Sequence, residues 1–147
     1  MGENVKTASA LLKNGKIYIQ AYAETTAGVW IAFGPVHVCR IDELEKLRSS
    51  ILEALAHSTR GVLHPSQQGW KDVQRPMLEA VDAKNWASLA KGARAVSLEC
   101  EDEIVRLIPS LDYHRDGGTS LEDKAISLPL EDKGVSASLI RAFELST

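Results

Sequence analysis

The sequence predicts an α+β fold in which a mostly antiparallel sheet packs against helices, in two layers of a single domain, residues 1–147. A chain of this length fits one domain. Apolar residues alternate with polar ones at a period of two in residues 16–24 and 95–108, as in strands. They recur at helical spacing in residues 44–55 and 135–143. The connections between the expected strands are short, which favours antiparallel pairing.

The first expected strands lie near the N-terminus. Lys16–Glu24 alternates its side chains as a strand does, and Asn14-Gly15 before it has the residues of a tight turn. Gly28–Arg40 is rich in β-branched and aromatic residues on both sides of Gly34-Pro35. We therefore expect two short strands or one bulged strand at a sheet edge. Thr25–Gly28 would close the hairpin between the two segments.

A helix is expected to follow. Asp42 is a good N-cap, and Glu45 three residues later completes a pattern like a capping box. The helix should end near Ser58, with Gly61 as a left-handed stop. Its apolar stripe should face the sheet and consists of Leu44, Leu47, Ile51, Leu52 and Leu55.

The middle of the chain has a weaker pattern. Gly61–Gln74 is the segment richest in loop-forming residues, and its structure is left open. Trp70 in this loop is a candidate for an exposed anchor. Pro76–Gly92 predicts one or two short helical turns, in which Trp86 is expected to pack.

From Ala93 the period changes from near 3.6 to two. Leu98 and Cys100 then lie on one face of a strand, and the opposite face is acidic. Asp102-Glu103 falls where a tight turn is needed, and Ile104–Ile108 continues as the next strand. These residues predict a hairpin with one buried face.

A third strand is expected at Ala125–Leu130, after a loop that contains Asp116-Gly117-Gly118. Asp132 can then cap a helix over Gly134–Glu144. The apolar stripe of this helix consists of Val135, Leu139, Ile140 and Phe143.

Charge is distributed unevenly along the chain. The 17 Lys and Arg residues and 20 Asp and Glu residues give a net charge of −3. Residues 1–98 hold 12 basic and 9 acidic residues, whereas residues 99–147 hold 5 basic and 11 acidic ones, a net charge of −6. A nucleic-acid binder needs a basic surface to replace the counterions around phosphate. The asymmetry therefore argues against direct nucleic-acid binding and favours a basic partner.

The sequence also favours a cytosolic protein that does not enter the membrane. The longest uncharged run, Thr25–Cys39, is shorter than the roughly 18 or more apolar residues of a membrane span. The N-terminus lacks the architecture of a signal peptide. The N-terminus has only a short apolar patch, and residues 1–14 are expected to be poorly ordered. Cys39 and Cys100 are expected to be reduced and buried.

Four carboxylates crowd the stretch SLECEDEIVRL, residues 97–107: Glu99, Glu101, Asp102 and Glu103. Paired carboxylates do acid–base catalysis when burial separates their pKa values. These side chains are expected to face solvent instead, and no histidine or lysine is fixed beside them in sequence, which disfavours catalysis. A solvated strand face that discourages edge pairing is one interpretation. A surface that meets a partner is the other.

Other chemistries find little support. A zinc site from His37, Cys39 and Cys100 is conceivable if their strands are neighbours, but no Cys-x-x-Cys or His-Glu-x-x-His spacing accompanies it. We find no Gly-x-Ser-x-Gly motif and no phosphate-binding loop. No cofactor is therefore predicted. An enzyme would have to use His37, His64 or His114 with a carboxylate that is distant in sequence.

Four stretches, GVWIAFGP, HPSQQGW, NWASLAKGARAVSLECED and VSASLIRAFELS, occur in this order between Gly28 and Ser146. In type and spacing they resemble a family of bacterial immunity proteins from contact-dependent growth inhibition systems. The resemblance implies a cytoplasmic protein without enzymatic activity. Such a protein binds the toxic C-terminal domain of a large exported toxin, frequently a nuclease, and occludes its active site. The resemblance assigns no binding residues, because each immunity protein matches its own toxin.

The expected partner-binding carboxylates are inferred from the distribution of charge along the sequence alone. A nuclease must present a basic cleft to phosphate, so an inhibitor that presents carboxylates would be steered toward it. Aromatic anchors would then prolong the complex. The predicted contacts are Glu99, Glu101, Asp102, Glu103, Asp112, Asp116, Trp70 and Tyr113, with Glu122 and Asp123 as further carboxylates.

Two other functions stay open. One is a small hydrolase or transferase with a histidine–carboxylate site, and the other is an adaptor for a different basic partner. A deep pocket that combines a histidine with a buried carboxylate would favour the enzyme. An acidic, shallow and convex surface would favour an inhibitor.

Overall fold

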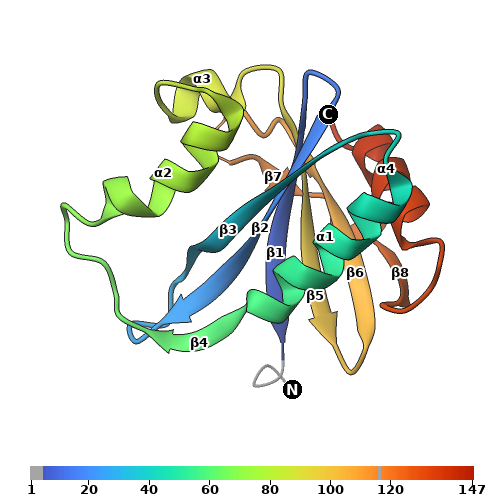
Figure 1. Ribbon diagram of the computed structural model, residues 1–147, viewed down its shortest axis with the longest axis horizontal. Helices are drawn as coiled ribbons and strands as arrows, with labels where there is room; N and C mark the ends of the chain where they lie inside the picture. The colour runs from blue at the N-terminus through green and yellow to red at the C-terminus, as the bar shows by residue number, and fades with distance from the viewer. Residues whose placement is uncertain (1–4, 116) are drawn as a thin grey trace.

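The computed structural model describes residues 5–115 and 117–147, which form one open sheet with helices on both faces (Figure 1). In these residues the sheet has eight strands, with the order β3-β2-β1-β5-β6-β7, while β4 pairs with β2 and β8 with β6. The strands are β1 (Lys6–Lys13), β2 (Lys16–Thr25), β3 (Trp30–Arg40), β4 (Thr59–Val62), β5 (Arg94–Glu101), β6 (Ile104–Leu111), β7 (Thr119–Ser120) and β8 (Ile126–Pro129). The helices are α1 (Leu44–His57), α2 (Trp70–Val81), α3 (Trp86–Ala90) and α4 (Val135–Leu145), with a short 3₁₀ helix η2 (Glu122–Lys124). Among the strand pairs of the described residues, only that of β2 with β4 is parallel, so the predicted α+β fold with a mostly antiparallel sheet is confirmed.

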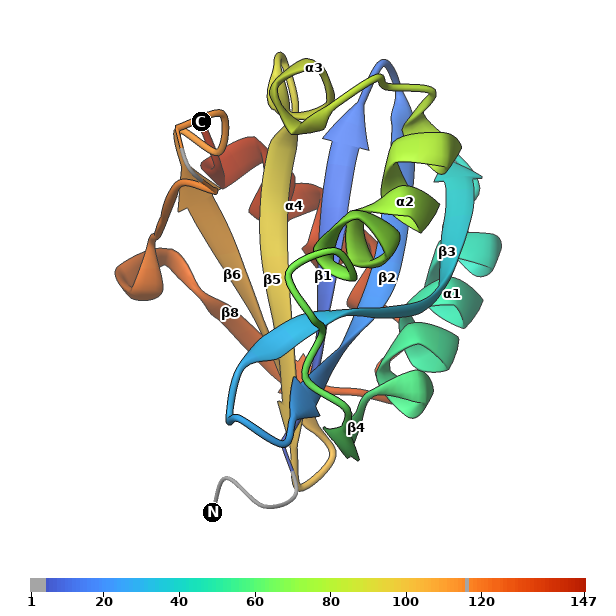
Figure 2. The same cartoon turned by 90° about the vertical axis from the view of Figure 1, so that its left-hand side faces the viewer.

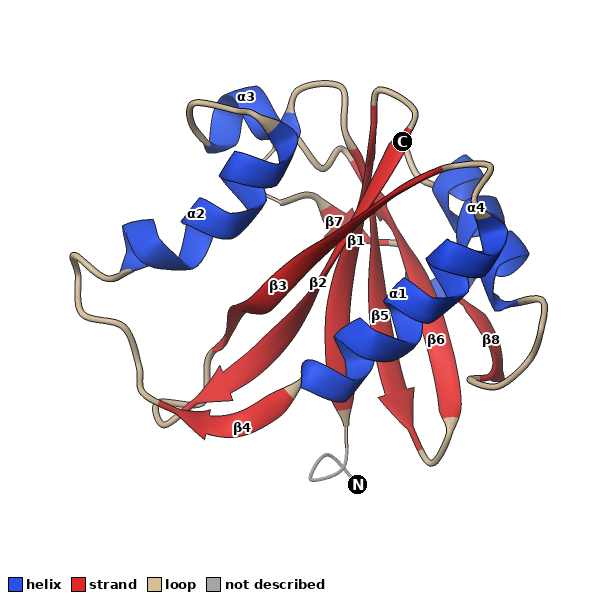
Figure 3. Cartoon of the chain, in the orientation of Figure 1, coloured by secondary structure: helices blue, strands red, loops and turns tan. Residues whose placement is uncertain are grey.

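The two faces of the sheet carry different helices (Figures 2 and 3). α1 and α4 cover one face, and the main core lies beneath them, including Leu47, Leu98 and Phe143, each at most 1% exposed. α2 and α3 lie over the opposite face, above a smaller cluster around Tyr18 and Leu89. The larger core is the predicted layer of helices on a sheet. The second helical layer was not predicted, because the sequence pattern in the middle of the chain is weak.

The N-terminal segment corrects one expectation. Lys6–Lys13 is not poorly ordered but forms β1 in the middle of the sheet, paired with β2 on one side and β5 on the other. Ala8 and Ala10 alternate inward and are at most 1% exposed. These alanines are too small to give a strong apolar signal. Residues 1–4 lie outside the described residues.

In the β1–β2–β3 meander, a tight turn joins β1 to β2, and its residues Asn14 and Gly15 have φ values of 54° and 77°. β2 matches its predicted range, and β3 is one strand at the sheet edge, as one of the two alternatives predicted. The pairing of β2 with β3 shifts register between Ile19 and Ala21. This β-bulge leaves Gln20 without a partner residue on β3. Its side chain hydrogen-bonds to the Gly34 carbonyl instead.

α1 begins later than predicted. The predicted cap at Asp42 is wrong: Glu43 is the N-cap and its side chain forms no cap hydrogen bond. The Glu43 carboxylate instead accepts a hydrogen bond from the Arg40 backbone N–H at 2.7 Å. The predicted stripe is buried at Leu47, Ile51 and Leu55, but Leu44 in the first turn is 47% exposed.

β4 follows α1 almost immediately and was not predicted. Gly61, the expected helix stop, lies within this strand at a φ of 83°. Ser58 joins the elements at their junction, because its hydroxyl donates to the Tyr22 carbonyl at 2.8 Å and accepts from the Thr7 backbone N–H at 3.0 Å. The strand pairs in parallel with the end of β2, a contact that the local sequence pattern does not encode.

The short helical turns expected in Pro76–Gly92 are confirmed, as the second half of α2 and as α3. α2 starts earlier, at Trp70, so this residue is helical rather than part of a loop. α3 is capped by Asn85, whose side-chain oxygen accepts from the Ser88 backbone N–H at 2.9 Å. No helix in the described residues is long and apolar enough to cross a membrane.

The C-terminal half follows the prediction closely. β5 and β6 form the expected hairpin, and β8 and α4 lie within one residue of their predicted starts. The N-cap of α4 is Gly134, not Asp132 as predicted; the Asp132 side chain has another contact. Its carboxylate accepts from the Gly134 backbone N–H at 2.7 Å and so orders the turn before the helix.

Candidate functional site

The predicted acidic strand and turn form one feature, which we name the acidic hairpin: Glu99, Glu101, Asp102 and Glu103. As predicted, Leu98 and Cys100 point into the core, at 0% and 8% exposure. Glu99 and Glu101 are half-buried on the opposite face of β5. Asp102 and Glu103 are exposed at the tip of the hairpin.

A positively charged side chain, that of Arg106, lies within this acidic region. Arg106 on β6 is directly opposite Glu99 in the register, and its guanidinium lies 3.6 Å from the Glu99 carboxylate. It also donates a hydrogen bond to Glu122. Arg106 therefore bridges two of the predicted carboxylates and makes the surface less negative. In the described residues, no ion pair compensates the charges of Asp102 and Glu103 at the hairpin tip.

The remaining predicted contacts lie elsewhere. Asp112 and Tyr113 follow the far end of β6, whose eight residues extend over roughly 26 Å at about 3.3 Å each. Asp116 lies outside the described residues. Trp70 begins α2 and is 38% exposed, with its ring edge-on to His64 at 5.6 Å between centroids. The predicted residues therefore occupy three regions rather than one continuous surface.

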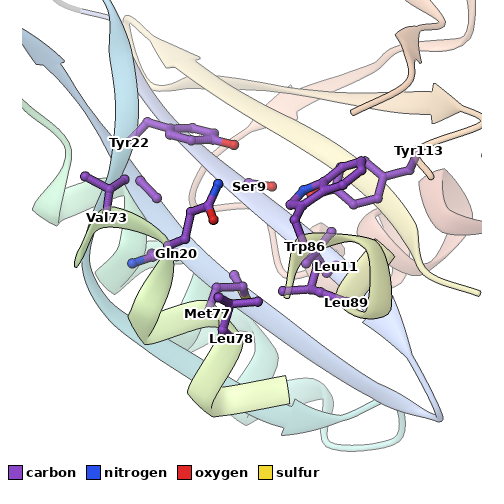
Figure 4. A pocket seen from close by; sticks show the side chains of 12 residues that line it. Ser9, Leu11, Gln20, Tyr22, Val73, Met77, Leu78, Trp86, Leu89 and Tyr113 are labelled. Atoms are coloured by element: carbon purple, nitrogen blue, oxygen red, sulfur yellow. The ribbon is translucent and has the colours of Figure 1, made fainter. Parts of the chain in front are cut away.

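A cleft lies on the sheet face beneath α2 and α3, and among the described residues Tyr113 is the one predicted contact that lines it (Figure 4). Its narrow part has a volume of about 170 Å³, and it continues into a wider hollow of about 490 Å³ toward Ser110 and Gly117. We use the name cleft for both parts. None of the described residues that line it is charged.

The floor of the cleft is polar. Gln20 on β2 pairs with Ser9 on β1, and Ser9 pairs with Ser97 on β5, so three polar side chains lie in a row across the sheet. The β-bulge leaves Gln20 with no partner on β3, and its amide donates to the Gly34 carbonyl at 2.8 Å. Gln20 is only 2% exposed. The row is therefore a polar strip within the sheet that helices cover on one side.

Aromatic side chains form the wall. The rings of Trp86 and Tyr113 pack at 5.8 Å between centroids with a tilt of 52°. Burial raises the pKa of Tyr113 to about 12, with a further contribution from Tyr22, while a hydrogen bond with Trp86 lowers it. The Tyr113 hydroxyl therefore stays protonated at neutral pH and can donate a hydrogen bond.

A glycine holds Tyr113 in this position. Gly118 has a φ of 77°, and a Cβ atom there would lie 2.6 Å from the Leu111 carbonyl oxygen and 2.9 Å from the Tyr113 Cα. No side chain fits so close to backbone. Residue 118 can therefore lie this close to Leu111 and Tyr113 only as glycine.

The histidines lie outside the cleft. His37 approaches Glu53 at 3.6 Å, and His64 shares a hydrogen bond of 3.1 Å with the Thr25 hydroxyl. His114 is exposed. Neither His37 nor His64 is combined with a buried carboxylate in a deep pocket within the described residues.

The zinc hypothesis fails on distance. Its premise was that the strands of Cys39 and Cys100 are neighbours, but β2 and β1 separate β3 from β5. Three strand spacings of about 4.8 Å place the two thiols too far apart for one ion. In the described part of the chain, no three His, Cys, Asp or Glu side chains are grouped to hold a metal ion.

Sequence reasoning missed most of the cleft. Trp86 was expected only to pack, and Ser9, Gln20 and Ser97 were not singled out. The sequence gives no signal for Gln20 or Ser97, because Gln20 lies on the same side of its strand as Tyr18 and Tyr22, and Ser97 on the acidic side of its own, so both fit the expected alternation. Their meeting in one row depends on the register of β2, β1 and β5, which no local pattern encodes.

Comparison with known proteins shows that the chain shares its fold with solved structures. No protein-family model matches the chain, and no curated protein matches it. A protein of unknown function from Neisseria meningitidis aligns over 99% of this chain and 97% of its own, with a TM-score of 0.80 and 18% identity. A chain of the CdiA-CT/CdiI toxin and immunity complex from Yersinia pseudotuberculosis aligns over 97% of this chain and 98% of its own, with a TM-score of 0.75 and 16% identity. At these identities the likeness is one of fold.

Proposed function

We propose that this chain is an immunity protein that binds and neutralises the toxin domain of a contact-dependent growth inhibition system. The likeness of fold to a chain of a toxin and immunity complex, over 97% of this chain, carries the proposal. The four sequence stretches that resemble immunity proteins support it independently of the fold. We infer that the chain acts by binding rather than catalysis, and in the cytoplasm.

The proposed partner is a basic toxin domain, such as a nuclease, whose active site the chain occludes. The support is electrostatic: residues 99–147 carry a net charge of −6, and the hairpin tip presents Asp102 and Glu103 to solvent. Opposite charge steers encounter and raises association rates. Because Arg106 bridges Glu99 and Glu122, we assign the steering mainly to the tip, while Glu101 lies next to it.

Aromatic contacts would prolong the complex. Trp70 is partly exposed and can bury further against a partner, as interface tryptophans often do. Tyr113 is half-buried beside Trp86 and lines the cleft, so a partner would contact it there. Asp112, near this end of the molecule, remains a proposed contact, and so does Asp116, which lies outside the described residues. The adaptor hypothesis predicts the same charges but a different partner.

Co-expression tests the proposal. The C-terminal domain of the exported protein encoded beside this chain is induced in bacteria with and without this chain. We expect growth arrest by the domain alone, growth with both, and a stable complex in size-exclusion chromatography. Expression of this chain alone is the control and should not slow growth, because a toxin chain would. The absence of both rescue and a complex would refute the immunity role.

A further inference from the structure

The floor of the cleft offers hydrogen-bonding groups that the fold does not use. Gln20, Ser9 and Ser97 lie in one row, and Ser110, which is 5% exposed, lines the same cleft from β6. Within the described residues, the hydroxyls of Ser9, Ser97 and Ser110 form no hydrogen bond with the protein. Ser9 and Ser97 are partly exposed, so water can reach their hydroxyls in the cleft, and a bound molecule that hydrogen-bonds to them takes the place of that water. The floor therefore has free donors and acceptors that a bound molecule can satisfy.

The walls suit a flat ring. Trp86 and Tyr113 form an aromatic surface on one side, and Met77 and Leu78 of α2 line the cleft on the other. Aromatic rings attract other rings through stacked or tilted contacts. The narrow part, about 170 Å³, has the volume of roughly five or six water molecules at about 30 Å³ each. This space admits one ring, and the wider hollow accommodates a substituent.

The lack of charge limits the ligand further. None of the described lining residues carries a charge, and burying a charged group without a partner costs far more than burying a neutral one. A phosphate or carboxylate would find no counter-charge. The ligand that fits is therefore neutral, flat and rich in donors and acceptors along its edge.

We propose that the cleft is a binding site for a nucleobase or neutral nucleoside. A base has a face that stacks on aromatic side chains and an edge that exchanges hydrogen bonds with hydroxyl and amide groups. In this geometry the ring packs against the wall of Trp86 and Tyr113, and its edge meets Ser9, Ser97 and the free carbonyl side of Gln20. The ribose extends into the wider hollow. The proposal is independent of the toxin partner.

Titration of the purified chain tests the site. Adenosine, guanosine, cytidine and uridine are added to the Trp70→Phe variant, in which Trp86 and Trp30 are the remaining tryptophans. We expect at least one nucleoside to change the fluorescence saturably, at one site by calorimetry. Its 5′-monophosphate should bind more weakly, because the cleft offers no counter-charge. D-glucose tests whether any neutral hydroxylated ring suffices, and should not bind.

Paired serine variants locate the binding. Ser97→Ala removes one floor hydroxyl and should weaken nucleoside binding about fivefold, the typical contribution of one hydrogen bond. Ser127→Ala on β8 removes an exposed hydroxyl outside the cleft and should leave binding unchanged. Equal thermal unfolding of both variants excludes a folding defect. The proposal is overturned if no nucleoside binds at millimolar concentration, if glucose binds as tightly, or if Ser97→Ala binds like the wild type.

Discussion

At the scale of single residues, Tyr113 shows how the cleft changes chemistry. Its pKa is raised from 10.0 to about 12, chiefly because burial penalises the charged phenolate. Between these pH values the folded chain keeps a proton that the unfolded chain has lost. The folded-state preference is fully present below pH 10.0 and is lost as pH rises through about 12, so stability should fall over this interval.

An alkaline titration checks this prediction. The phenolate absorbance of the wild type should include a tyrosine that ionises near pH 12, and Tyr113→Phe should remove that step and reduce the loss of stability above pH 10. Burial also raises the pKa of Tyr18, so some late ionisation should persist in the variant. If the step that Tyr113→Phe removes lay near pH 10.0 instead, the cleft would not exclude water from this hydroxyl.

Two neighbouring glycines separate backbone strain from steric fit. Gly117 and Gly118 both have positive φ, at 86° and 77°, but only Gly118 lies against backbone atoms. Gly117→Ala should cost about 1 kcal/mol, because alanine disfavours this conformation. Gly118→Ala adds a clash of 2.6 Å with the Leu111 carbonyl and should cost about 2–4 kcal/mol in total.

Chemical denaturation of the two variants measures the difference. Gly118→Ala should also change the environment of Trp86, and hence its fluorescence, because the turn that carries Tyr113 must move. Equal losses of stability in the two variants would contradict the close approach of Gly118 to β6.

At the scale of elements, the tip of the acidic hairpin is a turn whose residues suit charge better than conformation. Asp102 and Glu103 have φ values of 52° and 65°, the pattern of a type I′ turn, in which Asn-Gly is preferred. Replacing Asp102→Asn and Glu103→Gly together should raise the free energy of unfolding by about 1 kcal/mol. Thermal unfolding measures this gain. A loss of stability would mean that the two carboxylates hold the turn.

The same double variant isolates steering from folding, if the chain is an immunity protein. It removes two negative charges from the tip without weakening the fold, so association with the basic toxin domain should slow, and more at low salt than at high salt. Glu45→Gln with Glu79→Gln removes the same charge from exposed sites on α1 and α2, away from the hairpin. Stopped-flow mixing compares them. Equal association rates would leave the hairpin as a solvated strand face alone.

Local chemistry explains which elements were predictable. Asn14-Gly15 specifies its turn within two residues, Asp102-Glu103 interrupts an alternating apolar pattern, and the stripes of α1 and α4 each repeat within one helix, so sequence reasoning finds these features. β4 is different: Thr59–Val62 is a strand because the end of β2 lies beside it. The cleft is harder still, since Ser9, Gln20 and Ser97 become one row only through pairing among three strands. The acidic residues were easy to find, but their division between the two ends of β6 was not.

At the scale of the whole molecule, the two helical layers are held with unequal strength. α1 and α4 each bury five residues against the sheet, whereas α2 buries none completely and α3 buries two. Apolar burial dominates the free energy that keeps a helix docked. The layer over the cleft should therefore open more often than the layer over the main core.

Hydrogen exchange tests this asymmetry with a pair of matched leucines. Amides of α2 should exchange well before those of α1 and α4 in the wild type. Leu98→Ala in the main core should cost about 2–5 kcal/mol and speed exchange throughout, because that core stabilises the whole sheet. Leu89 is almost as buried, at 3%, but belongs to the smaller cluster, so Leu89→Ala should speed exchange mainly in α2 and α3. If α2 were as protected as α1, or if the two variants had the same exchange pattern, the layers would unfold as one unit, and the cleft would be a fixed cavity rather than one that opens to admit what it binds.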